Sequence, residues 1–179
     1  MNDKKILLTF GLIGGAITVI HFFLLGTLWI ADPDNPNWDM AEIMGYATMI
    51  LALSTVFFGV KAYRDKQRNG YISFKDAFLN GLIIVLIASV IYVIGWMFYY
   101  PNFMPDFVDQ YKAQQIALIQ ESGLTAEEIS QKIEEINQQM DTYSQPMVMI
   151  VFTFLEIFPV GLIIALITAF ILKKKTAAV

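Results

Sequence analysis

The chain has 179 residues, of which 56% are hydrophobic and 16% are charged, and its formal net charge is −4. Soluble domains carry roughly 25% charged residues, so this composition and a mean hydropathy of +0.56 indicate a protein solvated mainly by lipid. The lack of cysteine excludes disulfides and thiolate chemistry, and a single histidine excludes a multi-histidine metal site in one chain, so we expect no cofactor or metal. Acids and bases occupy separate segments, a pattern typical of membrane topology rather than of nucleic-acid binding.

Four apolar segments are long enough to cross a bilayer, whose core needs about 20 apolar residues in a helix. Long apolar runs without two-residue alternation favour helices over strands. We therefore predict transmembrane helices over residues 6–31, 40–60, 77–100 and 147–172. The first is interpreted as a retained span rather than a signal peptide, because its apolar run exceeds the usual length of about 7–15 residues and no cleavage site follows.

The distribution of basic residues predicts the topology. Lys and Arg residues cluster at three places: the N-terminus, the turn between the second and third spans, and the C-terminus. Only Lys112 and Lys132 lie elsewhere. We expect the protein to lie in the cytoplasmic membrane. The positive-inside rule then places the basic clusters, and so both termini, on the cytoplasmic side. Aromatic residues gather near the predicted outer ends of the spans: Trp29, Trp38, Trp96, Tyr99 and Tyr100.

Small and acidic residues mark the first two spans. Gly11 and Gly15 have the four-residue spacing that lets helices approach closely, either within the chain or in a dimer. Glu42 lies at the outer mouth of the second span, one turn before Tyr46. We expect it either to cap the helix N-terminus, where the helix dipole favours a negative charge, or to stand at a substrate entrance.

The turn between the second and third spans is short and basic. It contains Arg64 and Asp65, and its bases can bind anionic headgroups at roughly 1 kcal/mol each. Ser73 with Asp76 three residues later is a helix-start signature, with Asp in place of the usual Glu.

Between the third and fourth spans, residues 101–146 form the only sizeable segment outside lipid. Phe103, Phe107 and Tyr111 recur at the four-residue spacing of one helix face. Thr125 and Glu128 form a capping-box sequence that starts a second helix. An apolar stripe follows: Ile129, Ile133, Ile136, Met140 and Tyr143. We predict a helical hairpin that closes on itself or on the bilayer surface; the alternative is a docking surface for another chain.

One polar residue on each span lies at a similar depth, near the middle of the bilayer. His21 and Glu156 are each about 14 Å below the predicted outer boundary at 1.5 Å per residue, and Thr48 and Tyr92 fall close to that level. We hypothesise that Glu156 hydrogen-bonds His21 or Tyr92, either to hold the spans together or as a proton or ligand site. Pro159 can open room beside the glutamate by freeing a carbonyl of the preceding turn.

Several motifs together resemble a family of uncharacterised bacterial membrane proteins, a four-span domain of unknown function. The matching residues cover nearly the whole chain: Glu42-x-x-Gly45-Tyr46, Gly59, Tyr63-Arg64-Asp65, Gly70, Ser73-Phe74, Ala77-Phe78-x-x-Gly81, Tyr92, Trp96, Glu156 and Gly161. The resemblance implies a four-helix cell-membrane protein with an outer helical insert. It implies no activity, ligand or catalytic residue, although it draws attention to Glu42, Arg64 and Glu156.

The expected fold is therefore all-α: a single integral membrane four-helix bundle over residues 1–179, with an extracytoplasmic helical hairpin between spans three and four. The leading functional hypothesis is a non-enzymatic accessory or scaffold protein that binds a second copy of itself or another membrane protein. The runner-up is a small transporter or channel subunit that uses the His21, Tyr92 and Glu156 layer. An intramembrane enzyme is the third reading, but no nucleophile or metal set accompanies Glu156 and His21.

Overall fold

The structure, a computed structural model, describes residues 3–28 and 37–174. These residues form α-helices and no named strand, so the predicted all-α class is confirmed. The helices are α1 (Asp3–Leu28), α2 (Trp38–Leu53), α3 (Thr55–Gln67), α4 (Phe74–Phe103), α5 (Phe107–Glu121), α6 (Ala126–Tyr143) and α7 (Pro146–Leu172). Trp29, the end of the first predicted span and the start of the turn after it lie outside the described residues.

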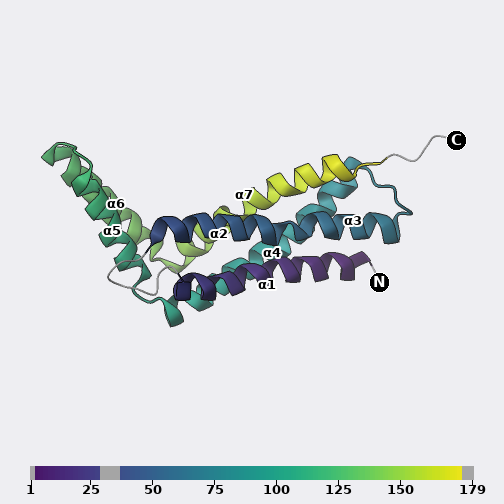
Figure 1. The fold of residues 1–179 in the computed structure, drawn as a ribbon, viewed down its shortest axis with the longest axis horizontal. Helices are drawn as coiled ribbons and strands as arrows, with labels where there is room; N and C mark the ends of the chain where they lie inside the picture. The colour runs from purple at the N-terminus through teal and green to yellow at the C-terminus, as the bar shows by residue number, and fades with distance from the viewer. Residues whose placement is uncertain (1–2, 29–36, 175–179) are drawn as a thin grey trace.

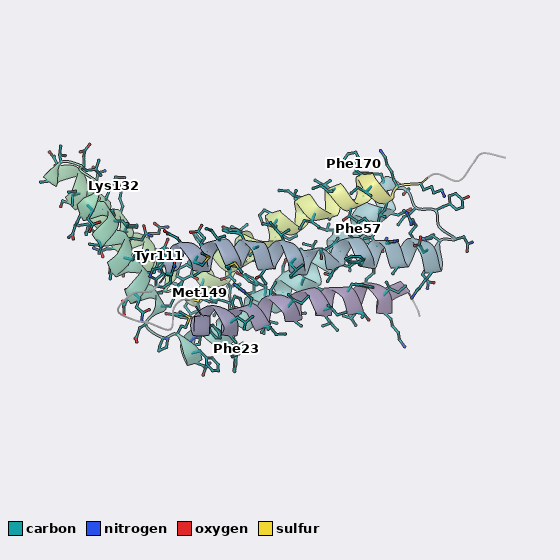
Figure 2. All side chains as sticks on the ribbon, viewed as in Figure 1. Phe23, Phe57, Tyr111, Lys132, Met149 and Phe170 are labelled. Carbon is teal, nitrogen blue, oxygen red and sulfur yellow. The ribbon has the colours of Figure 1, made fainter. Side chains whose placement is uncertain are left out.

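Four stretches of the described chain are long and apolar enough to cross a membrane: α1, α2 together with α3, α4, and α7. This confirms a multi-pass membrane protein. Figure 1 shows the four stretches running alongside one another, with α5 and α6 projecting beyond one end. We call this end the insert end. The other, where α1 begins and α7 ends, we call the termini end. Lys132 lies far out on the projecting pair, whereas Phe57 and Phe170 lie towards the termini end (Figure 2).

Close approach of α1 to α4 depends on two glycines. A Cβ at Gly11 would lie 2.7 Å from Cβ of Ile87, and one at Gly15 would lie 2.6 Å from Cβ of Ile91. Real Cβ atoms do not approach that closely, and the isoleucines branch at Cβ and cannot turn away. The four-residue glycine spacing therefore serves packing within the chain, as small residues do between membrane helices.

The second predicted span is interrupted at Ser54, between α2 and α3, and continues to Gln67 rather than Val60. The Ser54 hydroxyl donates to the carbonyl of Leu51 at 2.6 Å, and that of Thr55 donates to the carbonyl of Ala52 at 2.7 Å. Such bonds from a hydroxyl back to the preceding turn compete with the regular helical ladder. They explain an irregularity that apolar content alone does not predict.

The predicted start of the insert at Pro101 is too early. Helix α4 runs through Pro101 and ends at Phe103, with Met104 as its C-cap. Phe103 therefore does not share a helix with Phe107 and Tyr111, contrary to our expectation from their spacing; its ring stacks on Tyr99 of α4 at 5.3 Å. A proline inside a helix removes one amide hydrogen bond, but the helical ladder resumes after Pro101, since the amide of Met104 donates to the carbonyl of Tyr100 at 3.0 Å.

Two helix starts follow their sequence signatures to different degrees. The Ser73 side chain accepts from the amide of Asp76, but the Asp76 carboxylate meets the Ser73 hydroxyl rather than its backbone, so the reciprocal half of a capping box is missing. At α6 the box is complete: Thr125 Oγ1 accepts from the amide of Glu128, and the Glu128 carboxylate accepts from the amide of Thr125 at 2.9 Å. The shorter Asp side chain explains the difference.

The capping box makes the first turn of α6 sensitive to acid. Hydrogen bonds from the Thr125 side chain and backbone lower the pKa of Glu128 below its ordinary value of 4.5. A carboxyl with a lowered pKa contributes stability above the unfolded-state value, and this contribution is lost as pH falls through the folded-state value. We expect the protection factors of the amides at residues 126–128, which are corrected for the intrinsic exchange rate at each pH, to fall below about pH 4.5. Glu128→Gln should remove that dependence, while Glu134→Gln, on the same helix, should retain it.

Contacts between the turn and the C-terminal end hold the termini end together. Ile72 and Lys174 form an antiparallel β-bridge, with N–H···O distances of 3.1 and 2.9 Å. Arg64 Nη1 donates to the carbonyl of Leu172 at 3.4 Å, and Arg64 Nε lies 2.7 Å from a carboxylate oxygen of Asp65. Arg64 therefore satisfies a terminal carbonyl of α7 that has no partner within the helix.

Candidate functional site

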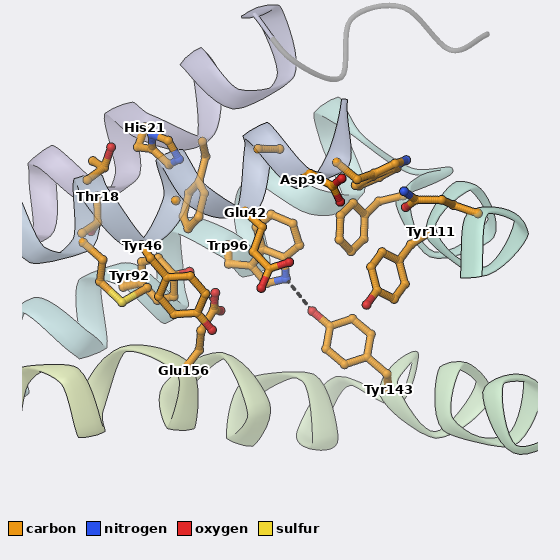
Figure 3. Close-up of a pocket in the computed structure, with 18 of the residues that line it drawn as sticks. Thr18, His21, Asp39, Glu42, Tyr46, Tyr92, Trp96, Tyr111, Tyr143 and Glu156 are labelled. Atoms are coloured by element: carbon orange, nitrogen blue, oxygen red, sulfur yellow. Dashed lines mark hydrogen bonds between the residues drawn. The ribbon is translucent and has the colours of Figure 1, made fainter. Parts of the chain in front are cut away.

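A cavity of about 320 Å³ lies at the insert end, between the spans and the projecting helices. Its walls come from α1, α2, α4, α5, α6 and α7. Figure 3 shows polar and aromatic side chains from these helices pointing into a common space. Along α2 it runs from Trp38 to Met49, eleven residues or about 16 Å of helix. The cavity therefore extends from the insert into the depth of the spans.

The four residues of the predicted polar layer all line this cavity: His21, Thr48, Tyr92 and Glu156. The hydroxyl of Tyr92 donates to Glu156 Oε2 at 3.0 Å. His21 is buried and lies beside Gly45 of α2, with Nε2 at 3.8 Å from the position a Cβ would take there. The four residues that were predicted to lie at one depth, by counting along each span, therefore surround a single cavity.

Glu42 and Tyr46 belong to the same cavity. Glu42 does not cap α2, contrary to the first of our two expectations, because the cap is Asn37, whose Oδ1 accepts from the amide of Met40 at 3.0 Å. Asp39 is the acid in the first turn, and Glu42 lies beyond it, where the helix has no unpaired amides left. It is exposed and turned to the cavity.

Arg64 and Asp65 lie elsewhere, at the termini end, where they pair with each other. Neither lines the cavity. The structure therefore does not join Arg64 and Asp65 to the polar layer.

Glu156 lies on an outward-facing side of α7, although it is ten residues from the start of that helix. The residue is exposed, and seven residues later, on the same side, Ile163 is 57% exposed. Across the cavity on α2, Tyr46 is 44% exposed and Ile50, one turn on, is 57% exposed. The side of the cavity between α2 and α7 is therefore accessible from the surface of the bundle, where exposed apolar residues adjoin it.

Aromatic rings form much of the cavity wall. Phe22 contacts Tyr92 with ring centroids 5.0 Å apart and Trp96 with centroids 5.2 Å apart. Trp96 Nε1 donates to the hydroxyl of Tyr143 at 3.1 Å, which ties α4 to the end of α6 (Figure 3). Burial, with the charge of Glu156 adding to it, raises the pKa of Tyr143, so its hydroxyl stays neutral over the physiological range.

The insert contributes side chains that sequence reasoning did not include. Tyr111, Gln114, Gln115 and Leu118 of α5 line the cavity, as does Tyr143 of α6. Packing of Trp38 and Ala41 of α2 against the first turns of α5 brings them there. Tyr111 and Tyr143 were placed on apolar helix faces, but the sequence gives no signal that these faces meet the mouth of the spans.

The charge of the cavity lining is negative. Asp39, Glu42 and Glu156 contribute carboxyl groups, and none of the described lining residues is Lys or Arg. In the described part of the chain, no three His, Cys, Asp or Glu side chains come close enough to hold a metal ion. The arrangement can accept protons or attract a positively charged molecule, and its hydroxyls and amides can orient one.

Comparison with known proteins agrees with the motifs. Residues 9–174 match the model of a family described as protein of unknown function, DUF4199. No curated protein and no solved structure matches the chain. Because the matched region covers almost the whole chain, including all the spans and the insert, the chain belongs to the DUF4199 family.

Proposed function

We propose that this chain is a multi-pass protein of the cytoplasmic membrane that binds a small solute within the bilayer, as a transporter or channel subunit rather than as an enzyme. The observation that carries the proposal is Glu156, an exposed carboxyl near mid-span that is hydrogen-bonded to Tyr92 in a cavity of about 320 Å³. Ionisable groups at such depth are expensive to keep, and they typically serve ion or substrate pathways.

The size and placement of the cavity support solute binding over a purely structural role. Ligand sites are concave spaces of about 300–1,000 Å³ with apolar walls and a few convergent polar groups. A glutamate that only held the spans together would be enclosed between them. Instead, Glu156 adjoins open space that extends towards the insert end.

The basic residues around the termini end support a cytoplasmic location for that end, and hence for both termini. The insert and the mouth of the cavity then lie outside the cytoplasm, so water reaches Glu156 from the outer side.

A second candidate is binding to another membrane protein or to a second copy of this chain. It is favoured by α7, whose apolar stretch buries only 22% of its residues within the chain, the lowest share among the four spans. A partner on this face would cover Glu156, so the two candidates predict different accessibility for the same side chain.

The test uses the absence of native cysteines. We expect Glu156→Cys to react with a cationic, membrane-impermeant thiosulfonate added outside intact cells, because water follows the cavity to that position. Ile163→Cys, on the same helix face but among apolar neighbours, should stay unlabelled, since the thiolate does not form in hydrocarbon. Glu134→Cys on α6 is the positive control.

Labelling of Glu156→Cys only from the cytoplasmic side would contradict the proposed orientation. No labelling from either side, with the α6 control reactive, would contradict an open cavity and support a covered α7 face.

A further inference from the structure

The chemistry of the cavity restricts what it can bind. Its three carboxyl groups, on Asp39, Glu42 and Glu156, are not balanced by any Lys or Arg among the described lining residues. Anionic molecules would be repelled, and an uncharged molecule would leave the negative charge of the carboxylates uncompensated. A positive charge near Glu156 would compensate for the cost of holding that acid at mid-span.

The aromatic wall suits an organic cation better than a metal ion. Trp96 and Tyr92 face the cavity beside Phe22, and at the insert end Trp38 meets Phe107 edge-on with ring centroids 5.5 Å apart. Ring faces attract ammonium and related cations, and the attraction is strongest when water is excluded. A small inorganic ion would need a shell of oxygen ligands, which these rings do not provide.

Two buried polar atoms add a second, independent sign of a missing ligand. The indole Nε1 of Trp38, a residue that is only 8% exposed, has no hydrogen-bond partner in the part of the chain that the structure describes, and neither has Oε1 of Gln114. Both residues line the cavity. Buried polar groups in native proteins are seldom left unpaired, because each unpaired group loses its hydrogen bonds to water without replacement.

The sideways opening between α2 and α7 indicates how such a molecule arrives. Glu156 shares its helix face with Ile163 and Ile167, which are 57% and 52% exposed. On α2, Tyr46 lies one turn from Ile50. A molecule dissolved in the bilayer therefore meets the acid through an apolar gap, whereas a strongly hydrated ion would first have to lose its water there.

We propose that the cavity binds a lipophilic organic cation, an amine or onium group on an apolar body, which passes between α2 and α7 and places its charge beside Glu156. This assignment rests on the proposed function and specifies its ligand class. Tyr92 orients the Glu156 carboxylate through its hydrogen bond, and the rings of Trp96 and Phe22 contact the apolar body.

The test is equilibrium binding of tritiated tetraphenylphosphonium to the full chain in lipid nanodiscs, with empty nanodiscs subtracted. We expect saturable binding, and displacement by unlabelled tetraphenylphosphonium at far lower concentration than by tetramethylammonium, which has the charge without the apolar body. Glu156→Gln should weaken binding by at least about tenfold, equivalent to about 1.4 kcal/mol. Glu42→Gln, at an exposed position, should weaken binding by a smaller factor.

The matched control is Glu134→Gln on α6, which removes the same charge away from the cavity and should leave binding unchanged. Displacement by tetraphenylborate, an anion of the same shape, as effective as by tetraphenylphosphonium would overturn the assignment, and so would equal affinity in Glu156→Gln and the unaltered protein. If Glu156→Cys is labelled from outside but no saturable cation binding occurs, the assignment fails while the proposed function stands. If neither occurs, both fail.

Discussion

Gly15→Leu is expected to destabilise the protein by about 3 kcal/mol, the upper end of the usual cost of overpacking. A Cβ at this position would lie 2.6 Å from Cβ and 2.7 Å from Cγ2 of Ile91. Since Ile91 is branched next to the α4 backbone, relief requires α1 and α4 to move apart. Leucine is a better helix former than glycine by roughly 1 kcal/mol, but this gain is smaller than the cost of separating the two helices. Thermal or denaturant unfolding in detergent measures the effect.

Gly45→Ala is the control for the glycine prediction, because its added Cβ meets nothing nearer than His21 Nε2 at 3.8 Å, an ordinary contact. Its free energy of unfolding should lie within about 0.5 kcal/mol of that of the unaltered protein. If Gly15→Leu were equally stable but changed the oligomeric state, the glycine pair would serve contacts between chains and the arrangement of α1 on α4 would be wrong.

Replacing both partners of the mid-span hydrogen bond is expected to stabilise the protein by about 2 kcal/mol. An acid at the centre of a span costs about 2.5–3.5 kcal/mol on insertion scales, and Glu156 is exposed on a face it shares with apolar residues. Tyr92→Phe alone should cost about 1 kcal/mol. Glu156→Leu alone should gain less than the double variant, because it leaves the Tyr92 hydroxyl without its acceptor. Unfolding in bicelles, read as a double-mutant cycle, gives each value.

This cycle separates a site kept for binding from a bond kept for packing. If the hydrogen bond serves only to hold the helices together, the double variant should have a lower free energy of unfolding. If Glu156 is kept for binding, the double variant should be more stable but should no longer retain its ligand. Ile163→Leu, on the same face, controls for the change in apolar surface and should leave stability within about 0.5 kcal/mol. A double variant less stable than Tyr92→Phe would assign Glu156 to packing.

The spans were predictable because lipid imposes a simple rule: a helix of about 20 apolar residues crosses the bilayer core. This rule found α4 and α7 to within a few residues. It failed at Ser54 and Pro101, where the outcome depends on local hydrogen bonds. Hydropathy does not register a hydroxyl that donates to the preceding turn, nor does it show whether a helix continues through a proline.

The cavity was predictable only in part. Depth counting brought His21, Thr48, Tyr92 and Glu156 to one level, and the structure places them around one cavity. Depth does not give rotation about the helix axis, so it did not reveal that Glu156 faces outward. Depth also did not place Glu42 in the wall of the cavity. Glu42 is free to line the cavity because Asn37, and not Glu42, caps α2. The contribution of Gln114 and Tyr143 depends on how α5 and α6 fold back onto the spans, which local sequence does not encode.

The β-bridge between Ile72 and Lys174 has a consequence for the order of assembly during synthesis. Ile72 precedes α4, yet its partner lies 102 residues later in the chain, after α7. Until Leu172 and Lys174 have been synthesised, the backbone of Ile72 and Nη1 of Arg64 have only water or lipid headgroups to bond, although Arg64 Nε can already pair with Asp65. The helices can insert one after another, but the end of α7 is joined to this turn only after the whole of α7 has been made. A nascent chain stalled before Leu172 should therefore expose this turn to proteases that the finished protein resists.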